Sequence, residues 1–117
     1  MKLNQGDIFF CHDERGTHRV LIVSVEKFNR GSHVHTVIFT TKKLHLRSQP
    51  NYVFFAAGEP GIDQDCVMQA ESLERTPVRY LDFQQGLLGQ ASDDKLGDVI
   101  AAVGHIIGAA CYLTEEA

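Results

Sequence analysis

A chain of 117 residues, of which 44% are hydrophobic, is long enough to bury a core without disulfides or a metal, so we expect one folded domain over residues 1–117. The net charge of −4 argues against strong non-specific binding to nucleic acid, which needs a basic surface. No apolar run has the length of a membrane span, and the first residues lack the features of a secretory signal. The sequence therefore predicts a cytoplasmic protein that is not associated with a membrane.

Stretches rich in apolar or β-branched residues alternate with polar stretches, which predicts strands separated by loops. The expected strands cover residues 7–11, 19–25, 34–41, 52–56 and 65–72, with a last short strand within residues 86–90. Between the first strands we expect a polar loop over residues 12–18, a turn over residues 28–32 and a basic loop over residues 42–50.

After the last strand the sequence changes to a helical period. Ser92 can cap a helix whose first turn carries Asp93 and Asp94, which favour the positive end of the helix dipole. Apolar residues then follow at helical spacing, at Leu96, Val99, Ile100, Val103, Ile106 and Ile107. A second stripe consists of small residues, which suggests close approach to another backbone, either the barrel or a second subunit: Gly97, Ala101, Gly104 and Gly108. Strands followed by one helix predict an α+β or small-barrel domain.

The cysteines and several histidines give no sign of a metal site. The chain has three cysteines, far apart in sequence, at Cys11, Cys66 and Cys111. We therefore expect reduced thiols in or near the core, with a nucleophilic or redox cysteine as the lesser alternative. His33 and His35 lie on one strand face but lack further ligands. The two histidines expected on the surface, one in a loop and one on the helix, are His12 and His105.

Four motifs resemble those of one known family. Gly6-Asp7-Ile8 is similar to its opening G-D-[IVL], and Thr40-Thr41 to its strand-ending threonine. The stretch from Glu14 to Ser24, with His18 and Arg19, resembles E-x-x-x-[HR]-R-P-x-[LV]-[VI]-[LI]-S, but it lacks the proline and is one residue shorter between the arginine and the serine. The run from Gly89 to Asp94 leads into the helix as the family's G-x-[LV]-x-x-[DE] does. In this order they resemble the MazF/PemK (Kid) toxins of type II toxin–antitoxin systems, over essentially the whole chain.

The resemblance implies a small SH3-like β-barrel of the CcdB/Kid/MazF type with a C-terminal α-helix. It also implies a homodimer that cleaves single-stranded RNA without a metal or other cofactor and is neutralised by a cognate antitoxin. Contact with DNA would then be indirect, through the antitoxin. The gyrase-poisoning CcdB toxins share this fold, so the fold alone does not decide the chemistry.

Metal-free RNA cleavage uses the 2′-hydroxyl of the substrate as the nucleophile and leaves a 2′,3′-cyclic phosphate and a 5′-hydroxyl. The reaction needs a base, an acid and a donor that stabilises the phosphorane. The resemblance gives the last task to Arg19, whose guanidinium matches two phosphate oxygens, with a hydroxyl donor at Thr40. Glu14 and His18 could share proton transfer, or could simply belong to a solvated loop.

A second group of residues could guide the RNA backbone, although charged runs of this kind are usually solvated loops. These residues are Arg15, Lys42, Lys43, His45 and Arg47. Glu71, which keeps a carboxylate where the family has one, is expected to contact the RNA as well.

The chain also departs from the family pattern. Val20 replaces the proline after Arg19, and the loop between the first two strands is shorter than usual. Where the family has Asp-Gln-x-[RK], this chain has Glu71 followed by Glu74, which inverts a charge, and Gln69 stands where the PemK/Kid branch has an arginine that helps catalysis.

Three functions therefore remain open. The first is a sequence-specific endoribonuclease toxin. The second is a protein of the same fold whose catalysis is weak or lost and which acts on a protein target. The third is a small-barrel interaction domain unrelated to toxins.

Overall fold

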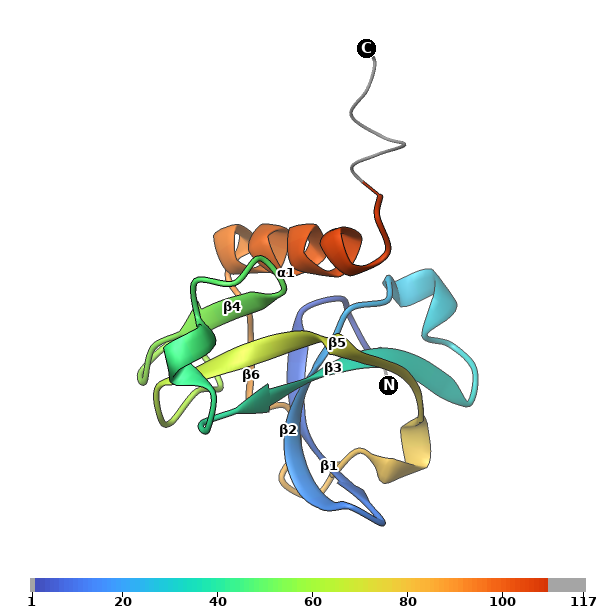
Figure 1. The fold of residues 1–117 in the computed structure, drawn as a ribbon. Helices are drawn as coiled ribbons and strands as arrows, with labels where there is room; N and C mark the ends of the chain where they lie inside the picture. The colour runs from blue at the N-terminus through green and yellow to red at the C-terminus, as the bar shows by residue number, and fades with distance from the viewer. Residues whose placement is uncertain (1, 110–117) are drawn as a thin grey trace.

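The computed structural model describes residues 2–109, which form one curled, six-stranded antiparallel sheet and a single α-helix (Figure 1). The strands, hydrogen-bonded in the order β4-β5-β3-β2-β1-β6, are β1 (Asp7–Asp13), β2 (Gly16–Ile22), β3 (His33–Thr40), β4 (Tyr52–Phe55), β5 (Cys66–Pro77) and β6 (Gly89–Gln90). The helix is α1 (Asp93–Ile106), and three single 3-10 turns are η1 (Glu26–Phe28), η2 (Leu44–Leu46) and η3 (Val78–Tyr80). The curled sheet forms a half-barrel, and with the C-terminal helix it confirms the expected α+β fold, a small β-barrel followed by a helix.

The expected loop over residues 12–18 is wrong, because β1 and β2 form a tight hairpin. Asp13 pairs with Gly16, so only Glu14 and Arg15 form the turn, and Gly16 takes a φ of 110° that favours glycine. The residues predicted as a polar loop are cross-strand pairs on the exposed end of the sheet. β2 also ends at Ile22, earlier than the expected residue 25.

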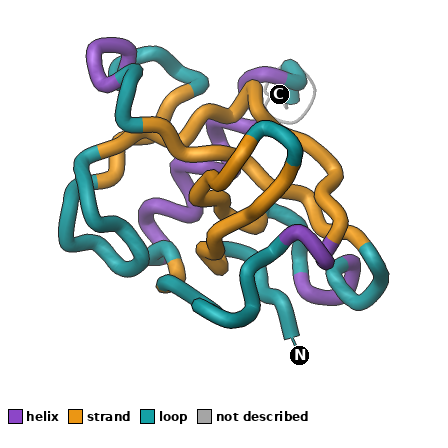
Figure 2. Tube along the Cα trace, turned by 90° about the horizontal axis from the view of Figure 1, so that it is seen from below, coloured by secondary structure: helices purple, strands orange, loops and turns teal. Residues whose placement is uncertain are grey.

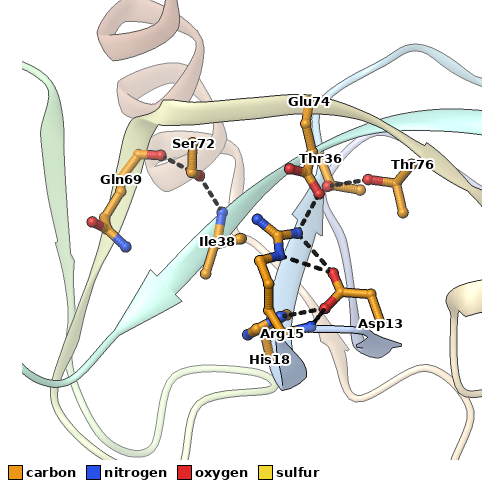
Figure 3. A network of polar contacts seen from close by, with 9 residues as sticks. All are labelled: Asp13, Arg15, His18, Thr36, Ile38, Gln69, Ser72, Glu74 and Thr76. Carbon is orange, nitrogen blue, oxygen red and sulfur yellow. Dashed lines mark hydrogen bonds and ion pairs between the residues drawn. The ribbon is translucent and has the colours of Figure 1, made fainter.

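β5 continues beyond the expected residue 72 to Pro77 and bends in the middle. Its pairing with β3 jumps from Ile38–Gln69 to Thr36–Glu74, which leaves residues 70–73 as a bulge. The Ser72 hydroxyl provides hydrogen bonds to the backbone at this bulge. It accepts from the Ile38 backbone N–H at 2.7 Å and donates to the Gln69 carbonyl at 2.6 Å (Figure 3). The bulge bends β5 between its pairing with β4 and its continuation along β3.

The curl of the sheet, seen from below in Figure 2, creates two apolar clusters. Leu21 is buried in the cluster that the helix covers, whereas Val20 and Ile22 are buried in the other. β2 is therefore buried on both faces at this point, which explains its unbroken apolar run.

The helix confirms the expected start and cap, and it ends at Ile106, before the last members of the two predicted stripes. The Ser92 hydroxyl accepts from the Lys95 backbone N–H at 3.2 Å. Of the apolar stripe, Val99 is fully buried and Leu96 and Val103 pack against the core, but the remaining members are exposed: Ile100, Ile106 and Ile107.

The stripe of small residues does not approach the barrel of its own chain. Gly97 and Ala101 are exposed, and a Cβ on Gly97 would meet no heavy atom within 4 Å. The alternative, contact with a second subunit, stays a prediction. No helix in residues 2–109 is long and apolar enough to cross a membrane.

The loop over residues 56–65, between β4 and β5, packs against β6 at the other edge of the curled sheet. A Cβ on Gly89 would lie 2.3 Å from the Gly61 nitrogen, so only glycine allows this approach. The neighbouring Ile62 is buried, which anchors the loop next to Asp63.

Candidate active site

A pocket of about 380 Å³ opens at the ends of β2 and β3 and brings together most of the predicted catalytic residues. It is lined by Phe10, Thr17, His18, Arg19, Phe39, Thr40, Thr41, Lys42 and Cys66. A larger pocket of about 520 Å³ lies between β4 and α1, but its lining includes none of the predicted catalytic residues. We therefore take the smaller pocket, here called the Arg19 pocket, as the candidate site.

Arg19 presents its guanidinium to this pocket from β2. The group lies 4.9 Å from the centroid of the Phe10 ring, on the neighbouring β1 strand, and Nη1 donates to Asp63 Oδ1 at 2.9 Å. The Arg19 side chain is 19% exposed, whereas that of Asp63 is 67% exposed. The Nε atom is buried and has no hydrogen-bond partner within residues 2–109. Phe10 and Asp63 thus hold the Arg19 side chain in place at the pocket, where its partly exposed guanidinium can donate to an incoming anion.

Thr40 is the last residue of β3 and lies in the same pocket. Its hydroxyl oxygen accepts from the Lys42 backbone N–H at 3.2 Å. This bond uses a lone pair, so the hydroxyl hydrogen can still be donated to a ligand in the pocket.

His18 is oriented by a carboxylate that the sequence analysis missed. Its Nε2 lies 3.1 Å from Asp13 Oδ1 across the hairpin. The Asp13 side chain is only 5% exposed and also accepts from Arg15, and these hydrogen bonds, that from Arg15 first, hold the pKa of its carboxyl well below the usual range. Asp13 therefore stays ionised and fixes the His18 ring. The contact between Asp13 and His18 depends on the register of the β1–β2 hairpin. The local sequence predicts a longer loop there, so it gives no sign of this contact.

Arg15 and Glu74 form an ion pair outside the pocket. Arg15 Nη2 lies 2.6 Å from Glu74 Oε2 and 2.7 Å from Asp13 Oδ2, and these contacts, that with Asp13 first, raise the pKa of Arg15 (Figure 3). The inverted charge at Glu74 is therefore compensated within the chain. Glu14, the fourth predicted catalytic residue, lies exposed at the hairpin tip and does not line the pocket.

The other residues predicted to guide RNA lie in two places. Lys42 is exposed at the pocket, and the half-buried Lys43 and the exposed His45 follow it at η2. Glu71 is held against β4, where it accepts from Asn51 Nδ2 at 2.9 Å and from Tyr52 Oη at 3.0 Å, and it does not line the pocket. Burial, and secondly the bond to Glu71, raise the pKa of Tyr52.

Two of the three cysteines confirm the expectation of buried thiols. Cys11 and Cys66 are free and buried, and burial is the main reason that the pKa of each rises to about 11. Both are therefore protonated at neutral pH, so Cys66 forms an apolar part of the pocket wall rather than a nucleophile. Cys111 lies outside the described residues.

His12 is exposed, as expected, but it lies in β1 rather than in a loop and has two side-chain partners. Its Nδ1 lies 2.8 Å from Thr17 Oγ1 and its Nε2 lies 2.8 Å from Asp82 Oδ2. His105 lies exposed in the last turn of α1, as expected. Residues 2–109 contain no group of three or more His, Cys, Asp or Glu that could hold a metal ion.

Comparison of the sequence finds no matching protein-family model and no matching curated protein. Comparison of the structure finds close likenesses among solved structures. A mycobacterial endoribonuclease in complex with its cognate antitoxin superposes with a TM-score of 0.76 at 22% identity, covering 91% of this chain and 95% of that chain.

Two further structures are similar to this chain. MazF in the MazE–MazF complex of Deinococcus radiodurans gives a TM-score of 0.74 at 18% identity, covering 92% of this chain and 97% of that one. The Mycobacterium tuberculosis toxin MazF-mt6 gives 0.73 at 19% identity, covering 87% and 96%. At these identities the likeness establishes the fold: the chain has the fold of these toxins along nearly its whole length.

Proposed function

We propose that this chain is a MazF-family toxin of a type II toxin–antitoxin system that cleaves single-stranded RNA without a metal. The observation that carries the proposal is the Arg19 pocket, which unites a guanidinium, a hydroxyl and an imidazole in the fold of known endoribonucleases. By the same likeness, we propose a cytoplasmic homodimer that a cognate antitoxin neutralises, since two of the similar structures are complexes with an antitoxin.

The pocket can perform the steps of this reaction. The Arg19 guanidinium binds the non-bridging oxygens of the scissile phosphate and stabilises the phosphorane, and the Thr40 hydroxyl donates to the same group. His18, oriented by Asp13, transfers a proton. Lys42, at the edge of the pocket, attracts the RNA backbone.

The remaining predicted site residues have lesser parts in this proposal. Lys43 and His45 extend the basic edge beside Lys42. Arg15 and Glu71 hold neighbouring strands together through their hydrogen bonds, and we assign no step to Glu14 at the hairpin tip.

Induced expression in bacteria tests the proposal. Primer extension on cellular RNA should show new ends at a recurring short sequence with the wild type and none with Arg19→Ala. The matched control is Arg30→Ala, because Arg30 is an exposed arginine whose partner is Glu26 and which lies away from the Arg19 pocket. Absence of new ends with the folded wild-type protein would refute the proposal.

The contact between Asp63 and Arg19 favours a second candidate. A carboxylate already occupies the guanidinium, so a protein of this fold could have lost RNA cleavage and act on a protein target. In that case growth inhibition would persist in Arg19→Ala, whereas the endoribonuclease predicts that this substitution abolishes it.

A further inference from the structure

A chain of hydrogen bonds leads from the wall of the Arg19 pocket to the segment that follows η3. Thr17 lines the pocket two residues before Arg19, on the same side of β2. Its hydroxyl lies 2.8 Å from His12 Nδ1, and the opposite nitrogen of that ring lies 2.8 Å from Asp82 Oδ2.

The fold fixes all three residues. His12 and Thr17 are direct cross-strand partners in the β1–β2 hairpin. Asp82 is placed beside β1 because its backbone N–H donates to the Phe10 carbonyl at 2.8 Å. Its second carboxylate oxygen accepts from the backbone N–H groups of Gln84 and Gln85 at 3.0 and 2.9 Å. The carboxylate that holds His12 is therefore itself held.

The hydrogen-bond roles in this chain follow from chemistry. The hydrogen bond from His12, the largest cause, lowers the pKa of Asp82, so its carboxylate is ionised and can only accept. His12 Nε2 must then carry the hydrogen, and in the neutral ring Nδ1 presents a lone pair to Thr17. Thr17 donates to His12, which leaves its oxygen free to accept a hydrogen from a ligand in the pocket.

The reaction proposed above needs two proton-transfer groups, and only one imidazole, that of His18, lies among the pocket-lining residues in the described part of the chain. Glu14 does not line the pocket. The Thr17 hydroxyl is the pocket-lining group that is connected to a second imidazole. It lies on the same strand as Arg19, which would bind the phosphate next to the attacking 2′-hydroxyl.

We propose that Thr17, His12 and Asp82 form a proton relay that accepts the proton of the ribose 2′-hydroxyl. The inference rests on the proposed endoribonuclease function. Thr17 is then the residue that contacts the substrate, and His12 and Asp82 are positioning residues behind it.

The step balances as follows. While the 2′-oxygen bonds to phosphorus, its proton passes to Thr17 Oγ1 and the proton of Thr17 passes to His12 Nδ1, with Asp82 stabilising the imidazolium. The P–O5′ bond breaks, its electron pair stays on O5′, and protonated His18 supplies the proton of the new 5′-hydroxyl. Water then returns His12 to its neutral form and His18 to its protonated form.

Cleavage kinetics on a short RNA that contains the mapped cleavage site test the relay. Thr17→Val removes the hydroxyl at nearly constant shape, and His12→Gln keeps a hydrogen-bonding side chain that takes up no proton. Both should lower kcat by about 10²- to 10⁴-fold, with KM changed by less than about threefold. Thr17→Ser should restore kcat to within about tenfold of the wild type, and the control His105→Gln, on the helix surface, should cleave at the wild-type rate.

Two controls separate the possible outcomes. Equal binding of an RNA with 2′-deoxyribose at the cleaved position shows that a variant is folded and only its chemistry is impaired. If the wild type cleaves, Arg19→Ala does not, and either His12→Gln or Thr17→Val cleaves within threefold of the wild type, then the relay is refuted and the proposed function stands. If the folded wild type does not cleave RNA, both are refuted.

Discussion

Replacing Asp63 by asparagine should strengthen RNA binding, because the Asp63 carboxylate competes with phosphate for Arg19. The two groups are 2.9 Å apart, but Asp63 is 67% exposed, so solvent screens the pair. Exposed ion pairs contribute roughly 0.2–1 kcal/mol, so releasing Arg19 should tighten binding by about 1.4- to 5-fold. The asparagine side chain would keep the shape and a weaker hydrogen bond, which leaves the charge as the main difference.

Fluorescence anisotropy with an uncleavable 2′-deoxy-substituted RNA measures this affinity. The gain should shrink as salt is raised, because added ions screen the attraction. Asp94→Asn is the matched control, since it removes the same charge from the exposed first turn of α1. Equal gains in the two variants would mean that net charge alone is responsible, and no gain in Asp63→Asn would refute the competition between Asp63 and phosphate.

Three further substitutions test other parts of the account. Because its hydrogen bonds hold the pKa of Asp13 well below the usual range, its contribution to stability is complete above about pH 4 and is lost as the pH falls through the lowered pKa. In urea unfolding, Asp13→Asn should therefore be less stable than the wild type at pH 7, and the difference should shrink steadily as the pH falls from about 4 towards 2. Val99→Ala should lower the free energy of unfolding by about 2 kcal/mol, since Val99 is fully buried, whereas Ile100→Ala, at an exposed helix position, should be nearly neutral. Cys66→Ala should cleave RNA at the wild-type rate, because a thiol with a pKa of about 11 is not a nucleophile at pH 7.

Local patterns were enough to predict much of the fold. The apolar runs located all six strands, and Ser92 with the following aspartates located the start of the helix. They failed over residues 12–18, because polar residues at an exposed sheet end look like a loop. The second half of β5 was missed because a bulge interrupts the strand. The hydrogen bond from the Ile38 N–H to Ser72 at this bulge joins residues that are far apart in sequence, so no local pattern predicts it.

In the candidate site, too, local motifs predicted some residues, whereas contacts between distant parts of the chain were not predictable. Arg19, Thr40 and His18 were recognised from motifs, and the structure places them in one pocket. Their carboxylate partners were missed, because these contacts depend on the hairpin register and on a distant loop. Asp13 reaches His18 only through a two-residue turn, and Asp63 reaches Arg19 over 44 positions of sequence.

The chemistry of the RNA ends tests the central claim most directly. Purified protein should cleave single-stranded RNA in the presence of EDTA, and mass spectrometry should find a 2′,3′-cyclic phosphate and a 5′-hydroxyl at each cut. Folded Arg19→Ala should leave the RNA intact, while Arg30→Ala should cleave like the wild type. Intact RNA with the wild-type protein, or cleavage by Arg19→Ala at the wild-type rate, would contradict the assignment of the Arg19 pocket as a ribonuclease active site.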